Sequence, residues 1–190
     1  MRVIAGTHRS RQLAAPKGLD TRPTSDRLRE ALFNVLAPRI AGANVLDLYA
    51  GSGAVGIEAL SRGAAHVWFA EKALPAVAAI RANLKALRIE SGYTIDERGT
   101  RSLLTTLAEK GIAADILFLD PPYGAAHEYQ STLEFLGSAG ASALFAEDTL
   151  VVAEHSKKLP LTARYGALER TRVLQQSDAA LSFYRRVGSG

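Results

Sequence analysis

The sequence contains no cysteine, and only one methionine, one tryptophan and four histidines among its 190 residues. The lack of cysteine excludes disulfide bonds and thiol chemistry, and it agrees with a reducing, cytoplasmic location. The histidines show no metal-ligand spacing, so we expect no metal site. No apolar run approaches the length of a membrane helix, and the initial MRVIAGTHRSRQL lacks the apolar stretch of a signal peptide. We therefore expect no membrane contacts.

The charges are unevenly distributed along a chain of otherwise ordinary composition. With 47% hydrophobic and 22% charged residues, it predicts one main globular domain. The net charge of +4 conceals an acidic middle between two basic ends: residues 1–39 carry +5, residues 40–156 carry −6, and residues 157–190 carry +5. If the basic ends meet on one face, they form a patch suited to phosphates. The alternative is solvated charge scattered over the surface.

Strand and helix patterns alternate after Gly42. Strands are predicted over residues 44–49, 66–70, 93–97, 115–119 and 150–154, and helices over residues 54–61, 73–87, 101–109 and 128–136. This alternation predicts an α/β fold with a mostly parallel sheet and helices on both faces. Two further strands, over residues 163–170 and 180–185, have no helix between them. They predict an antiparallel hairpin at the edge of a seven-stranded sheet.

A smaller unit precedes this alternation. Residues 2–5 and 11–14 flank a glycine-containing turn and predict a short hairpin. After a loop rich in proline and glycine, Thr24 or Ser25 is predicted to cap a helix that runs to about residue 37. We therefore divide the chain into an N-terminal hairpin and helix, residues 1–40, and a main α/β domain, residues 41–187.

The segment VLDLYAGSGAVG, residues 45–56, reads as strand, glycine turn and helix start. Gly51, Gly53 and Gly56 match the GxGxxG fingerprint of dinucleotide sites, and Glu71 follows at the distance of a ribose-binding acid. A plain tight turn is the alternative. Asp47 would repel a pyrophosphate, whereas it would favour a cation such as S-adenosylmethionine. Alternatively, Asp47 only accepts hydrogen bonds from loop amides.

A second motif ends the strand predicted over residues 115–119. It is Asp120-Pro121-Pro122-Tyr123, whose prolines cannot continue a sheet ladder. The Asp120 carboxylate and the Pro121 carbonyl are two acceptors that can hold the protons of an exocyclic amine. The lone pair of the amine then points at a methyl donor, while Tyr123 offers a face for base stacking. The alternative is a strand stop with a helix-capping acid and a buried ring.

Several blocks together resemble a known family. Residues 47–53 are similar to the cofactor motif of S-adenosylmethionine-dependent methyltransferases with a Rossmann-like sheet, and residues 120–123 are similar to the tetrad of those that methylate amino groups. The block RPTSDRLREALFN, residues 22–34, with RVIAG near the start and EHS at residues 154–156, resembles the bacterial small-subunit ribosomal RNA guanine-N2 methyltransferases, the RsmD family. The resemblance covers nearly the whole chain.

The resemblance implies that residues 41–187 bind S-adenosyl-L-methionine and methylate a guanine N2 of 16S ribosomal RNA, within an assembled or assembling small subunit. A monomer is the default expectation. The implied catalytic residues are Asp120, Pro121 and Tyr123. The implied cofactor-binding residues are Thr24, Asp47, Gly51, Gly53, Glu71 and Asp120. The candidate RNA-binding residues are Arg9, Arg11, Arg22, Arg27 and Tyr123.

One departure and several alternatives stay open. Members of the family usually have an acid that holds the adenine amino group where this chain has Thr100, after Gly99. The tetrad also serves N6-adenine methylation of DNA or RNA, which is the main alternative. The GxGxxG match allows an NAD-dependent oxidoreductase, and the basic ends allow a non-catalytic RNA-binding module. Further candidates for the basic patch are Lys157, Lys158, Arg185 and Arg186.

Overall fold

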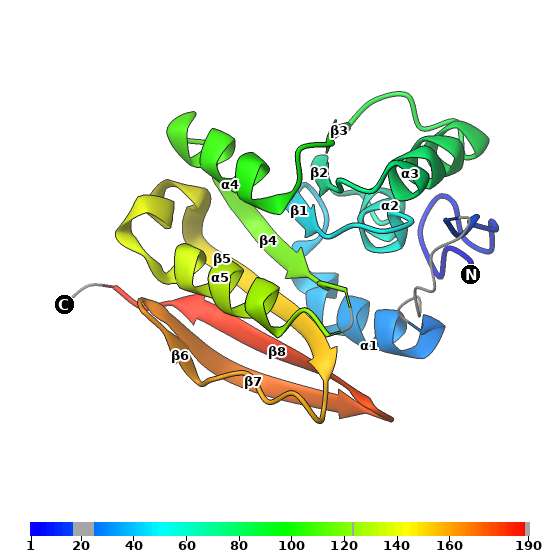
Figure 1. Cartoon of the computed structure of the whole chain (residues 1–190). Helices are drawn as coiled ribbons and strands as arrows, with labels where there is room; N and C mark the ends of the chain where they lie inside the picture. The colour runs from blue at the N-terminus through cyan, green and yellow to red at the C-terminus, as the bar shows by residue number, and fades with distance from the viewer. Residues whose placement is uncertain (17–24, 123, 189–190) are drawn as a thin grey trace.

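The computed structural model describes residues 1–16, 25–122 and 124–188 (Figure 1). Its helices are α1 (Asp26–Leu36), η1 (Ala37–Arg39), α2 (Ala54–Ser61), α3 (Leu74–Ala86), α4 (Thr100–Glu109), α5 (Ala126–Gly137) and η2 (Ala139–Leu144). Its strands are β1 (Asn44–Leu48), β2 (His66–Ala70), β3 (Tyr93–Asp96), β4 (Ala114–Leu119), β5 (Phe145–Ser156), β6 (Arg164–Tyr165), β7 (Leu168–Gln176) and β8 (Ala179–Arg186). The α/β alternation predicted after residue 42 is confirmed.

The strands in the described part of the chain form a single mixed sheet in the order β3-β2-β1-β4-β5-β8-β7-β6. Strands β1 to β5 are parallel, whereas β8 runs antiparallel to both β5 and β7. The predicted antiparallel edge hairpin is thereby confirmed. The order reverses between β1 and β4, and such a switch point is where open α/β sheets bind ligands.

Helices cover both faces of the sheet (Figure 1). Helices α1, α2 and α3 share one apolar cluster with strand residues such as Val45, Phe118 and Val152. Helices α4 and α5 share the other with the alternating residues Leu46 and Leu117. Burial on both faces explains why β1 and β4 read as nearly continuous apolar runs. No helix among the described residues combines the length and apolarity required to cross a bilayer.

The N-terminal hairpin and helix pack against this core. Arg2 and Gln12 form an antiparallel bridge, as the predicted hairpin requires. Ser25 caps α1, because its Oγ accepts a hydrogen bond from the Leu28 N–H at 3.2 Å. Val3 and Leu32 belong to the same apolar cluster as the sheet. The division of the chain at residue 40 stays a prediction.

The single strand predicted over residues 163–170 is wrong. The chain forms the two-residue β6, turns at Gly166 with φ +56°, and then begins β7, so the described sheet has eight strands rather than seven. A Cβ on Gly166 would lie 2.5 Å from the Gly137 carbonyl oxygen, so only glycine fits this turn. Strand β7 also extends to Gln176, because its polar sequence suits an exposed face near the sheet edge.

Candidate active site

A large cavity lies beyond the carboxyl ends of the parallel strands. Its volume is about 1210 Å³, and it is lined by the loops after β1 to β4, the end of β5, the start of α1 and the β7–β8 turn. Six acidic residues are among those that line it. Four of them lie on a strand or directly after one, namely Asp47, Glu71, Asp120 and Glu154, and the other two are Glu128 on α5 and Asp178 in the β7–β8 turn. An acidic cavity of this size suits a cationic ligand and leaves room for a second molecule.

The loop after β1 is tightly turned and held by Glu71. Tyr49 adopts φ +62° and Gly51 φ +56°, so the backbone bends sharply away from the strand. The Glu71 carboxylate accepts hydrogen bonds from the N–H groups of Gly51 at 2.9 Å and Ala73 at 2.8 Å. Glu71 therefore joins the first two loops of the site at the position predicted for a ribose-binding acid. Gly53 does not line the cavity; it caps α2 with φ +76°.

Asp47 is almost fully buried at the floor of the cavity. Its Oδ2 accepts a hydrogen bond from the Gly56 N–H at 2.8 Å, as the loop-amide alternative requires. Burial raises the pKa of Asp47 to about 8, and the charge of Glu71 adds to this rise. A cation bound in the cavity would favour the ionised carboxylate and lower this pKa again. The hydrogen bond to the loop and attraction of a cation are thus compatible.

The raised pKa of Asp47 predicts that cofactor affinity depends on pH. If a cationic cofactor binds beside Asp47, binding must release the proton that this carboxyl carries below about pH 8. The affinity for S-adenosylmethionine should rise with pH by at most about tenfold per unit, and level off above that pKa. Isothermal titration calorimetry from pH 6 to pH 9 measures this. The Asp47→Asn variant keeps an acceptor for the Gly56 N–H but cannot titrate, so it should lose this rise of affinity with pH. If the affinity of the variant depends on pH as that of the wild type does, Asp47 is not the group responsible.

Asp120 follows β4 and faces the same cavity. Its N–H donates to the Leu48 carbonyl oxygen at 3.3 Å, so the ladder between β1 and β4 ends there and the prolines terminate the strand as predicted. Burial raises the pKa of Asp120 well above its usual range, and the charges of Glu154 and Asp47 raise it further. Pro121 also lines the cavity. Both acceptors of the motif are therefore beside the cofactor loops.

The remaining predicted residues are divided between the cavity and the surface. Arg27 lines the cavity, whereas Arg9 and Arg11 are exposed on the N-terminal hairpin. Arg11 donates through Nη2 to the Ala86 carbonyl oxygen at 3.1 Å. Thr100, which stands where an acid is usual, also lines the cavity. Three predicted site residues lie outside the described residues, namely Arg22, Thr24 and Tyr123.

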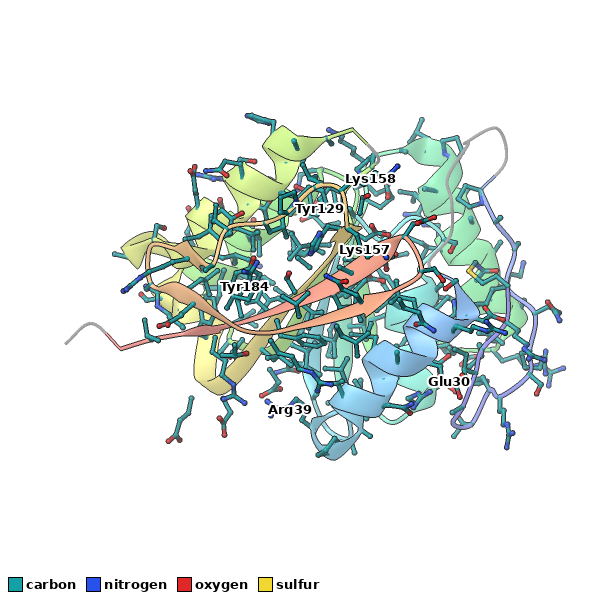
Figure 2. The ribbon with its side chains drawn as sticks, turned by 90° about the horizontal axis from the view of Figure 1, so that it is seen from below. Glu30, Arg39, Tyr129, Lys157, Lys158 and Tyr184 are labelled. Atoms are coloured by element: carbon teal, nitrogen blue, oxygen red, sulfur yellow. The ribbon has the colours of Figure 1, made fainter. Side chains whose placement is uncertain are left out.

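The four C-terminal candidates for the basic patch do not lie together. Lys157 and Lys158 follow β5 at the cavity end of the sheet, whereas Glu30 lies on α1 and Arg39 ends η1 (Figure 2). Arg185 and Arg186 end β8, which runs antiparallel, so they lie at the opposite end of the strands. Arg185 pairs with Asp148 at 2.7 Å. The expectation that all four share one patch is wrong.

Sequence reasoning missed two groups of residues in this site. The Tyr49 hydroxyl donates to Glu128 at 2.8 Å and lies 2.7 Å from the Thr132 hydroxyl, which joins the cofactor loop to α5. The Tyr129 hydroxyl donates to the Glu154 carbonyl oxygen at 2.7 Å and so joins α5 to β5. A sequence signal existed for Glu154, because it directly follows the apolar run of residues 150–153, just as Asp120 follows the apolar run of residues 116–119.

The chemistry of these groups fits S-adenosylmethionine. Two of the amides that could hold a pyrophosphate are already used, since Gly56 donates to Asp47 and Gly51 donates to Glu71. This arrangement disfavours the NAD alternative. Among the described residues, no group of three or more His, Cys, Asp or Glu is placed to hold a metal ion. The acids instead suit a ribose and the two positive charges of a sulfonium amino acid. The fold is that of the S-adenosylmethionine-dependent methyltransferases with a Rossmann-like sheet, and the residues of the cavity fit that class.

Comparisons with known proteins give the family. The family model described as Conserved hypothetical protein 95 matches residues 1–185. The chain is 36% identical over 192 residues to "Ribosomal RNA small subunit methyltransferase D" of Escherichia coli (strain K12), covering 100% of this chain and 92% of that protein. It is 34% identical over 188 residues to "Putative rRNA methyltransferase YlbH" of Bacillus subtilis (strain 168), covering 99% and 100%. The chain therefore belongs to the Conserved hypothetical protein 95 family, as its resemblance to the RsmD family predicted.

A solved structure supports the same relationship. The structure described as "Putative methyltransferase yhhF from Escherichia coli" matches with a TM-score of 0.81 and 30% sequence identity. The match covers 98% of this chain and 97% of that chain. The N-terminal hairpin and α1 are thus included in the shared architecture together with the sheet.

Proposed function

We propose that this protein transfers a methyl group from S-adenosylmethionine to the exocyclic N2 of a guanine in small-subunit ribosomal RNA. One observation carries the proposal: the two acceptors after β4 and the acidic cofactor loops after β1 and β2 line a single cavity. Two relatives that match nearly along their whole length are named as ribosomal RNA methyltransferases, which supports ribosomal RNA as the substrate class. The two acceptors support an exocyclic amine as the methylated group, and the resemblance to the guanine-N2 methyltransferases favours N2 of guanine over N6 of adenine.

The residues of the chain act mainly by position. Asp120 and the Pro121 carbonyl accept hydrogen bonds from the two amine protons, so that the nitrogen lone pair points away from them. S-adenosylmethionine supplies an electrophilic methyl group, whose bond to sulfur breaks as the bond to nitrogen forms, and the sulfur keeps the electron pair. The carboxylates of the cavity stabilise the positive charge that develops on the nitrogen. A proton then leaves the nitrogen through Asp120 to water.

We assign RNA contacts to residues 1–40 and to the cavity mouth. The exposed Arg9 and the cavity-lining Arg27 provide positive charge at two places in this part of the chain. The target base has to be unstacked to reach Asp120, and contacts to phosphates hold the RNA while this occurs. Tyr123 is proposed as the stacking face.

The assignment of Arg9 predicts a change in the salt dependence of RNA binding. The Arg9→Ala variant should bind ribosomal RNA more weakly, and the slope of log affinity against log salt should fall by about 1. Filter binding at several salt concentrations measures this slope. Lys110→Ala is a matched control, because Lys110 is also exposed but follows α4. Equal slopes for the two variants would show that Arg9 makes no phosphate contact.

Transfer of labelled methyl groups tests the proposed function. The acceptors are small ribosomal subunits from cells that lack the enzyme, deproteinised ribosomal RNA, and duplex DNA. Label in the subunits or their RNA supports the proposal, and a preference for subunits would indicate an assembled particle as substrate. Label in DNA alone would support the N6-adenine alternative. Binding of the RNA without transfer or cofactor affinity would support the non-catalytic alternative.

A further inference from the structure

The proposed mechanism assigns no specific contact to Glu154, one of the acids that line the cavity. Glu154 lies on β5, directly beside β4 (Figure 1). Leu119 pairs with Ala153, so Asp120 and Glu154 are the next residues on the two neighbouring strands. Side chains two residues apart on a strand point to the same face, so Asp120 shares a face with Phe118, and Glu154 shares a face with Val152. Phe118 and Val152 belong to the apolar cluster that includes α1. The two carboxyl groups are close enough for the charge of Glu154 to affect Asp120.

A further polar group lies at the same side of the cavity. Gln176 ends β7 and lines the cavity, and among the residues that the structure describes its buried Oε1 has no hydrogen-bond partner. Buried polar atoms in native proteins are nearly always paired, so this oxygen is available to accept a hydrogen bond from a ligand or a water in the cavity. Hydrogen-bond acceptors therefore form a row across the sheet, from Asp120 after β4 through Glu154 on β5 to Gln176 on β7. This row extends beyond what is needed to hold one amine.

The chemistry of the bases explains what such a row could recognise. In guanine, the exocyclic N2 is next to a ring nitrogen that carries hydrogen, N1–H. In adenine and cytosine, the ring nitrogen on the corresponding edge carries a lone pair. An acceptor placed beside Asp120 would therefore bind guanine and repel the other two amine-bearing bases. Sites built to hydrogen-bond a donor discriminate strongly against analogues that lack it.

We propose that Glu154 accepts a hydrogen bond from N1–H of the target guanine, and is the residue that selects guanine over adenine. The inference rests on the proposed function and names a determinant of its base specificity. Asp120 and Pro121 position the amine, and Glu154 reads the neighbouring ring atom.

A substituted base tests this role directly. The methylated position is first mapped, and subunits are then assembled with guanine or 2-aminopurine at that position. 2-Aminopurine keeps the N2 amine but has a lone pair at N1. The wild-type protein should prefer guanine by about a hundredfold or more in kcat/KM. In Glu154→Gln, whose amide can also donate, that preference should shrink at least about tenfold, because a new hydrogen bond to N1 becomes available.

The comparison separates specificity from structure. If Glu154 only supports the fold, Glu154→Gln lowers both rates equally, the preference is unchanged and the inference is overturned. Equal wild-type rates on the two bases also overturn it, whatever the variant does. Glu147→Gln is the matched control, because Glu147 is exposed on the same strand outside the cavity, and its preference should equal that of the wild type. If the wild type methylates no guanine in any acceptor, the proposed function itself fails and the inference falls with it.

Discussion

Replacing Asp120 by alanine should reduce the rate of methyl transfer by about 10²–10³-fold or more. The carboxylate is proposed to hold a proton of the target amine and to favour the charge that develops on nitrogen. Both effects are larger in the transition state than in the bound substrate, so the loss should appear in kcat. Affinity for S-adenosylmethionine should change far less, since Asp47 and Glu71 remain. Single-turnover transfer and calorimetric titration measure the two quantities.

Two further variants sharpen this prediction. Asp120→Asn keeps an acceptor oxygen but removes the charge, so it should retain more activity than the alanine variant. Asp148→Ala is the matched control, because Asp148 is exposed and pairs with Arg185 away from the cavity. Full activity in Asp120→Ala would contradict the mechanism. A loss of cofactor binding equal to the loss of rate would instead assign Asp120 to the cofactor.

Replacing Glu58 by alanine should destabilise the protein by about 3–5 kcal/mol. Glu58 is fully buried on α2 and accepts hydrogen bonds from the N–H groups of Ile4 at 2.7 Å and Ala5 at 2.9 Å. It also pairs with Arg62 at 2.7 Å, and its charge favours the cationic form of the fully buried Arg29. The alanine variant leaves two backbone donors and a buried cation without this carboxylate.

Urea unfolding measures the change in the free energy of unfolding. Glu58→Gln should fall between the wild type and Glu58→Ala, because its amide oxygen can still accept one of these hydrogen bonds. Glu109→Ala, an exposed change at the end of α4, should alter stability by less than about 0.5 kcal/mol. A loss below about 1 kcal/mol in Glu58→Ala would mean that this network contributes little to holding the N-terminal hairpin.

The parallel half of the fold could be predicted because each of its elements has a strong local signal. The helix expected over residues 54–61 and the strand over residues 66–70 have those bounds in the structure. The antiparallel half was less predictable. Strand β7 carries LERTRVLQQ, whose polar side chains hide the strand pattern, and the turn at Gly166 depends on its contact with Gly137. That contact joins residues far apart in sequence and leaves no local signal.

Some residues of the candidate site could be predicted from the sequence, and others could not. Asp120 stands directly before two prolines, Asp47 lies four residues before Gly51, and Glu71 directly follows an apolar strand, so strand ends and spacing predict that they meet. Glu58, which lies outside the cavity, could not be recognised, because the two backbone N–H groups that it binds lie 53 and 54 residues away and an acid on a helix usually faces solvent. Gln176 reaches the cavity only because β8 runs antiparallel and returns the β7–β8 turn to the ends of the parallel strands.

Identification of the methylated nucleoside tests the central claim most directly. Small subunits from cells without the enzyme are incubated with the protein and S-adenosylmethionine, and the RNA is then digested and separated by chromatography with mass detection. The account predicts one new nucleoside, N2-methylguanosine, which is absent when the Asp120→Ala variant is used. The appearance of N6-methyladenosine instead would contradict both the acceptor atom and the proposed role of Glu154.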